Sequence, residues 1–168
     1  MRAQVDFLQS LVDRWNIQDQ CFVIGGHRLK IELENIYFLT GLSKRGEQLS
    51  LFGTRPGGQS VASLRLEFCN DQTKDKWIDI KTIDHPELKI IEFTVTRLCG
   101  SEKLHVATRS QMQMAIDCFR GTIYNWCEAV LENVKGQLTR AKNGNLKNFG
   151  CGFIVVTFAL ERIPMLAP

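Results

Sequence analysis

Apolar residues recur along this chain with two periods, one typical of helices and the other of strands. At the start, residues three or four positions apart form one apolar stripe, which predicts a helix that ends near Asn16. The stripe consists of Val5, Leu8, Leu11, Val12 and Trp15. Asp13 and Arg14 lie beside it, as polar neighbours of a face that packs on a core.

The stretch CFVIGGHRLKIELENIYFLTGL, residues 21–42, predicts a hairpin followed by a short helix. Gly25-Gly26 separates the two strands, because paired glycines supply the positive φ angles of a tight turn. In the second strand the apolar positions are expected to face the core and the charged positions between them the solvent. The apolar positions are Leu29, Ile31 and Leu33. A helix then extends from about Glu34 to Gly41, where glycine can adopt the left-handed cap.

The middle of the chain is expected to hold a loop, a strand and a helix. Residues 43–60 are rich in glycine, which predicts a loop. Residues 64–68 alternate between apolar and polar as a strand does. Residues 85–100 keep a helical spacing with proline in the first turn, although their β-branched residues also favour a strand.

The strongest helical pattern lies near residues 111–142. Apolar residues from Met112 to Leu138 keep a 3.6-residue period. Because the phase continues through Gly121, the pattern predicts one long helix with a weak point there, or two nearly collinear helices. Ser110 and Gln113 are expected to form the capping box at its start, and Asn143-Gly144 to end it.

The last stretch, FGCGFIVVTFALERIPM (149–165), is apolar on most faces as far as Glu161. This predicts a buried helix that Pro164 ends. Together the patterns predict an α+β fold that is mostly helical, as a single domain over residues 1–168. A small antiparallel hairpin lies near its N-terminus, and a long helix runs from the centre towards the C-terminus.

Composition and cysteine spacing narrow the classes of function. With 44% hydrophobic and 23% charged residues, the 168-residue chain has the profile of a globular protein, and its net charge of +3 does not by itself imply a polyanionic partner. No signal peptide or membrane span is evident, so a soluble intracellular protein is expected. The six cysteines form no CxxC pair and the three histidines stand far apart. Free thiols are therefore expected, without disulfides or a metal site.

Catalytic signatures are missing from the sequence. It contains no phosphate loop, HExxH, nucleophile elbow or dinucleotide fingerprint. Glu128 and Glu132 lie one helical turn apart, but such a pair on an exposed face is more often solvated than catalytic. No catalytic residue is therefore predicted.

A basic segment, KGQLTRAKNGNLK, has two interpretations. It carries Lys135, Arg140, Lys142 and Lys147 with no acid between them. Four phosphate contacts would give a salt-sensitive affinity for nucleic acid. Cations near a helix C-terminus are equally explained by the helix dipole.

Four segments share their order with one protein family. They are LVDRW (11–15) with Phe22, LKIELENIYFLTGL (29–42) followed by Gly46, TIYNWCEAVLENVKGQL (122–138) and FALERIPMLAP (158–168). They resemble the plant mobile domain, whose pattern is a leucine-rich helix ending in Arg-Trp, a phenylalanine, and Ile-Thr-Leu-x-Asp-Val-x-x-Leu-Leu-Gly-Leu. A helical region and a Glu-Arg-x-Pro-x-x-x-Pro segment complete the pattern. The motif residues are Arg14, Trp15, Phe22, Gly41, Leu42, Glu161 and Arg162.

The resemblance implies a plant nuclear protein of transposon descent, related to proteins of the MAINTENANCE OF MERISTEMS type. Those proteins act in transposon silencing and meristem maintenance. Some members are labelled aminotransferase-like, yet a pyridoxal-phosphate enzyme needs a Schiff-base lysine and a phosphate cup. Lys89 or Lys103 could be nominated only by default, so neither enzymatic activity nor a cofactor is expected. Domains of the family often continue further, so we expect a truncated or compact member.

Two functions follow from this resemblance. The first is a non-catalytic interaction or scaffold domain that binds protein partners in a nuclear assembly. The second is a nucleic-acid-binding domain of a transposon-encoded protein, with weak, non-specific contacts. The motif residues are interpreted as structural: Arg14 could pair with Glu34 or Glu161, or it could belong to a binding surface. Arg162 with Glu161 has the same two interpretations.

Overall fold

Seven α-helices and two small antiparallel sheets make up the described part of the computed structural model, which comprises residues 2–49, 51, 59–70, 77–98, 106–144 and 152–163. The elements follow in the order α1 (Arg2–Asp13), β1 (Trp15–Asn16), β2 (Cys21–Ile24), β3 (His27–Lys30), α2 (Leu33–Thr40), α3 (Val61–Phe68), β4 (Ile78–Asp79), η1 (Ile80–Thr82), α4 (Pro86–Leu98), β5 (Val106–Ala107), α5 (Arg109–Phe119), α6 (Trp126–Lys142) and α7 (Gly152–Arg162). The predicted fold class, mostly helical with a small antiparallel sheet near the N-terminus, is confirmed.

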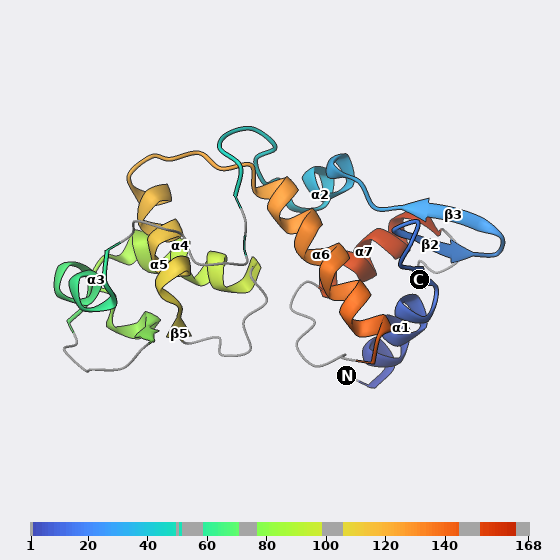
Figure 1. The fold of residues 1–168 in the computed structure, drawn as a ribbon, viewed down its shortest axis with the longest axis horizontal. Coiled ribbons are helices and arrows are strands. Elements are labelled where there is room, and N and C mark those ends of the chain that lie inside the picture. Colours follow the sequence, from blue (N-terminus) through green and yellow to red (C-terminus); the bar gives the residue numbers. More distant parts are fainter. Residues whose placement is uncertain are drawn as a thin grey trace.

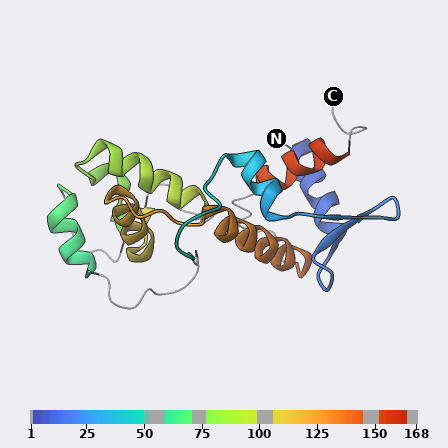
Figure 2. The ribbon, with the colours of Figure 1, turned by 90° about the horizontal axis from the view of Figure 1, so that it is seen from above.

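The elements form two groups along the longest axis of the molecule (Figure 1). The first group holds α1, α2, α6 and α7 with the sheet β1-β2-β3. The second holds α3, α4 and α5 with the sheet β4-β5. Seen from above, the same two groups lie side by side along that axis (Figure 2).

The N-terminal helix is shorter than its apolar stripe predicts. It ends at Asp13, and Trp15 lies in β1, where it pairs with Phe22 of β2. The backbone N–H of Val23 donates to the carbonyl of Arg14 at 2.9 Å. The chain therefore leaves the helix to join the sheet, and placing Trp15 inside the helix was wrong, although the residue is buried.

The hairpin and the short helix after it are confirmed. β2 and β3 pair antiparallel around Gly25 and Gly26, whose φ angles are +57° and +81°. Ile31 is buried. α2 then begins after Glu32, whose N–H donates to Asn35 Oδ1 at 2.8 Å.

Residues 64–68 form a helix, which contradicts the predicted strand. Ser60 Oγ accepts from the N–H of Ser63 at 3.1 Å and so caps α3. Leu64 and Phe68, four positions apart, are buried, whereas Leu66 is 78% exposed. Burial thus follows the helical period. The alternation involved only three apolar residues, which is too short a pattern to distinguish a strand from a helix.

The predicted long helix is two helices that are not collinear, since α5 lies in the second group and α6 in the first (Figure 1). Gly121, with φ +96°, follows the end of α5. The capping box at the start of α5 is formed by Thr108 and Gln111, two residues earlier than predicted. The predicted end of the pattern is confirmed, because α6 ends at Lys142.

One continuous cluster of buried apolar side chains extends through both groups. α7 contributes Ile154, Val155 and Phe158, as its apolar run predicts; Pro164 lies outside the described residues. Between the groups, Asn133 Nδ2 on α6 donates to the carbonyl of Leu98 at 2.7 Å. This buried bond fixes the end of α4 against α6.

Candidate functional site

Trp15 and Phe22 lie inside an aromatic corner of the first group. Each is 2% exposed, and their rings meet edge-on with centroids 5.0 Å apart. The ring of Phe158 on α7 lies 6.1 Å from that of Phe22. Trp15 Nε1 donates to Thr139 Oγ1 on α6 at 3.3 Å. These two motif residues therefore connect the hairpin, α6 and α7 and are inaccessible to a partner.

Arg14 does not form either of the ion pairs considered for it. Its guanidinium is exposed and donates to the carbonyl of Ser10 at 2.6 Å, on the last turn of α1. Glu34 pairs instead with Lys44 at 2.7 Å. Glu161 and Arg162 are exposed at the end of α7. Among the described residues, Arg14 therefore bonds to its own helix and pairs with neither Glu34 nor Glu161.

Gly41 and Leu42 end α2 and connect it to α6. Gly41 has φ +68°, and its N–H donates to the carbonyl of Tyr37 at 2.8 Å. Cys127 Sγ lies 3.0 Å from the carbonyl oxygen of Leu42 as a weak donor. Burial raises the pKa of this thiol, an effect that the charge of Lys44 partly offsets. The thiol is thereby kept in its protonated, unreactive form.

The outer side of α2 exposes two aromatic side chains that sequence reasoning missed. Phe38 is 76% and Tyr37 38% exposed, with ring centroids 5.5 Å apart. Lys44 Nζ lies 4.7 Å from the centre of the Tyr37 ring and also pairs with Glu34. We call Glu34, Tyr37, Phe38 and Lys44 the aromatic face of α2. The sequence did contain a signal for this exposure, because both aromatic residues fall outside the helical phase set by the buried Ile36.

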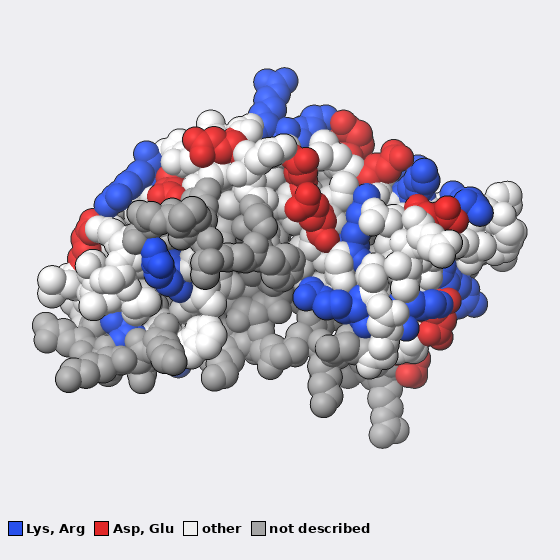
Figure 3. Space-filling model, in the orientation of Figure 1, with Lys and Arg blue, Asp and Glu red and all other residues white. Residues whose placement is uncertain are grey.

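The predicted basic segment does not gather on one side of α6. Lys135 and Lys142, seven positions apart, share a side of the helix, whereas Arg140 extends from another. Lys142 Nζ donates to the carbonyl of Asp13. Lys147 lies outside the described residues. Over the face shown in Figure 3, basic and acidic side chains are interspersed.

A groove of about 590 Å³ lies against α6. Its walls include Gln20, Glu128, Glu132 and Lys135, so acids offset the base in it. Glu128 Oε2 also accepts from Asn125 Nδ2 at 2.9 Å, in the first turn of α6. Such charged, open walls differ from the mostly apolar, enclosed pockets that small ligands occupy.

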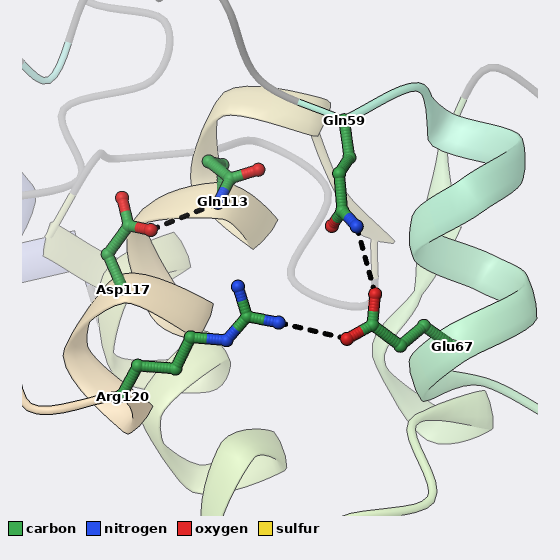
Figure 4. Close-up of polar contacts among 5 residues, drawn as sticks. All are labelled: Gln59, Glu67, Gln113, Asp117 and Arg120. Atoms are coloured by element: carbon green, nitrogen blue, oxygen red, sulfur yellow. Dashed lines mark hydrogen bonds and ion pairs between the residues drawn. The ribbon is translucent and has the colours of Figure 1, made fainter.

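A second cluster of polar side chains joins α3 to α5 (Figure 4). Glu67 accepts from Gln59 and from Arg120, both at 2.9 Å. Asp117 accepts from Gln113 at 3.0 Å and from the hydroxyl of Tyr124 at 2.8 Å. Both oxygens of each carboxylate are engaged, so this network holds elements together and offers no poised acid or base.

The most perturbed carboxyl of the described residues, Glu92 on α4, is completely buried. Burial raises its pKa from 4.5 to about 8, although the hydroxyl of Thr96, which donates to Oε1 at 3.0 Å, acts in the opposite direction. Oε2 has no hydrogen-bond partner among the described residues. A catalytic carboxyl would need access to substrate, which Glu92 lacks.

Side chains that could bind a metal or a cofactor lie apart from one another in the described residues. Within the described ranges no three His, Cys, Asp or Glu side chains gather as a metal site. Lys89 Nζ donates to the carbonyl of Lys81 at 3.2 Å, and Lys103 lies outside those ranges. Cys21 and Cys127 are buried free thiols, while Cys69 and Cys118 are partly buried.

Comparison of the chain with protein-family models, with curated proteins and with solved structures finds no match in any of the three. None of the helices in the described part is both long and apolar enough to cross a bilayer.

Proposed function

We propose that this chain is a non-catalytic interaction domain of a transposon-derived plant nuclear protein, which binds a protein partner in an assembly linked to transposon silencing or meristem maintenance. The observation that carries the proposal is the exposure of Tyr37 and Phe38 on α2. Large aromatic side chains on a surface are typical anchors of protein interfaces.

The position of these aromatic residues within the motif supports the proposal. Ile36 is fully buried, Asn35 accepts a bond at the start of α2, and Gly41 caps its end. These positions shape the helix. Tyr37 and Phe38 fall on the two adjacent positions that the family pattern leaves open. A helix fixed by its buried and capping positions, with two aromatic side chains left exposed, suits a domain that binds a partner.

The charges beside the rings add direction to the contact. Lys44 and Glu34 form a pair that is partly open to solvent, with side-chain exposures of 36% and 56%. A partner that covers Phe38 would also meet this cation and anion, which favours one orientation over others. An apolar centre with a charged rim is the usual anatomy of a protein interface.

Affinity capture from plant nuclear extract tests the proposal. The wild-type protein is expected to retain a defined protein partner at both low and high salt, because an apolar anchor is less screened than charges. Phe38→Ala should remove that partner. Leu66→Ala on α3, a comparably exposed apolar residue (78% exposed), is the matched control and should leave capture unchanged. Equal capture by both variants would refute the role of the aromatic face.

A nucleic-acid-binding domain is the second candidate, favoured by Lys135 and Lys142 on one side of α6. Any such binding should be weak and sequence-independent, and its affinity should fall steeply with salt, because it would depend on phosphate contacts. Changing Lys135, Arg140, Lys142 and Lys147 to Ala should abolish it. Tight or sequence-selective binding to DNA or RNA at physiological salt would favour this function over the first.

A further inference from the structure

The outward side of α4 is a stripe of exposed residues with an apolar centre. Its members are Pro86, Glu87, Ile90, Phe93, Thr94 and Arg97, all exposed and all on one side of the helix. Ile90 is 67% and Phe93 45% exposed. The outer face of a surface helix is normally polar, so these two side chains require an explanation. We call this set the α4 stripe.

The opposite side of α4 is already used. Leu88 and Val95 are buried there, and α4 packs mainly against α5. In Figure 2, α4 runs along one edge of the second group, and its C-terminal end, at Leu98, is bonded to α6. The α4 stripe therefore has no described element of its own chain to pack on.

The charges of the α4 stripe are arranged symmetrically about its apolar centre. Glu87 lies at one end and Arg97 at the other, ten positions or about 15 Å apart along the axis. Ile90 and Phe93 lie between them. If a second copy is turned by 180° about an axis perpendicular to the helix, each Glu87 comes opposite the partner subunit's Arg97. The apolar centres then face each other, so the pattern is complementary to itself, as a two-fold interface requires.

Neither charge is neutralised by a neighbouring group in the described residues. The structure shows no ion pair for Glu87 there, and the Arg97 guanidinium lies 4.9 Å from the centre of the Phe93 ring on the same helix. A cation stacked on an aromatic face keeps its N–H donors available at the ring's edge. Both ends of the α4 stripe can thus accept a partner of opposite charge.

We propose that two copies of this chain associate through the α4 stripe as an antiparallel helix pair. In this pair Glu87 of each protomer meets the partner subunit's Arg97, and Ile90 and Phe93 are covered. The inference goes beyond the proposed function, because it uses the second group of helices and not the aromatic face of α2. The two proposals can therefore fail independently.

Charge reversal tests the pairing directly. Sedimentation equilibrium of the wild-type chain should show a monomer–dimer equilibrium. Glu87→Arg and Arg97→Glu should each weaken it by on the order of tenfold or more, since each change places like charges opposite one another twice in the dimer. An equimolar mixture of the two variants should recover dimers, because both contacts between unlike chains are then of opposite sign.

Controls separate this pairing from other causes. Glu132→Arg, a charge reversal at an exposed residue of α6, should leave association unchanged. Phe93→Ser should weaken association by removing apolar contact, while the circular dichroism spectrum shows that the chain is folded. The proposal is overturned if the wild-type chain is monomeric up to millimolar concentration, or if folded Glu87→Arg and Arg97→Glu do not recover dimers on mixing.

Discussion

The buried carboxyl of Glu92 should make the stability of this protein fall with rising pH over an interval in which most proteins are stable. Its side chain is completely buried, one oxygen accepts from Thr96, and the other has no partner in the part of the chain that the structure describes. An ionised carboxylate in that position would lack both water and a full set of donors. Burial therefore raises its pKa from 4.5 to about 8.

The sign and size of the effect follow from proton binding. Below pH 4.5 the carboxyl is protonated in both the folded and the unfolded chain. Between pH 4.5 and about 8 only the folded chain keeps the proton, so the free energy of unfolding falls by about 1.4 kcal/mol per pH unit. Over the whole interval the loss is about 5 kcal/mol, and above it no further change arises from Glu92.

Glu92→Gln isolates this contribution, because the amide has nearly the same shape and does not titrate. Urea unfolding of both proteins from pH 4.5 to 8.5 gives the difference between their free energies of unfolding. As pH rises, the free energy of unfolding of the wild type should fall relative to that of Glu92→Gln, by about 5 kcal/mol in total. The exposed Glu132→Gln should show no comparable slope. A flat difference for Glu92→Gln would mean that water reaches the carboxyl in the folded protein.

Four further substitutions test the architecture, each by its urea midpoint. Trp15→Ala should cost roughly 3–5 kcal/mol because the indole is 2% exposed; an unchanged midpoint would place Trp15 on the surface. Gly46→Ala should cost about 3 kcal/mol, since at φ +114° the new Cβ would overlap the carbonyl of Ile123. Gly25→Ala should cost only about 1 kcal/mol, because at φ +57° the new Cβ meets no other atom. Equal costs for Gly25→Ala and Gly46→Ala would contradict this steric argument. Gly121→Ala should destabilise at φ +96°; an unbroken helix would instead be stabilised by about 0.5–1 kcal/mol.

Local signals were sufficient for the hairpin and for α2. The turn at Gly25-Gly26 and the left-handed cap at Gly41 need positive φ angles, which glycine provides within a few residues of sequence. Such features depend on no distant part of the chain. The turn and the cap could therefore be predicted in place, although the second strand ends at Lys30, before Ile31 and Leu33. β1 could not be predicted, because Trp15 leaves its helix to pair with Phe22 across a turn.

The candidate site was less accessible to sequence reasoning than the fold. Tyr37 and Phe38 stand within an apolar run, and aromatic residues in such a run are ordinarily assigned to a core. Only the placement of α2 over α6 and α7 shows which side is covered. Likewise, the expected pairing of Arg14 with Glu34 could not be tested without knowing that Lys44 returns to Glu34 from the following loop.

The break between α5 and α6 shows most clearly why an apolar period can mislead. Residues at the end of the α5 pattern keep the helical phase, yet Phe119 is 38% and Ile123 65% exposed, so neither is used to build the core. The backbone between α5 and α6 instead bonds to residues 43–47. Ile123 O accepts from the N–H of Glu47 at 2.9 Å, and the N–H of Cys127 donates to Ser43 O at 3.0 Å. Backbone groups inside a continuous helix could not make these bonds, because their partners would lie one turn away on the same helix. The point at which the stripe divides is thus set by residues 43–47, far upstream in the chain, and no local period could reveal it.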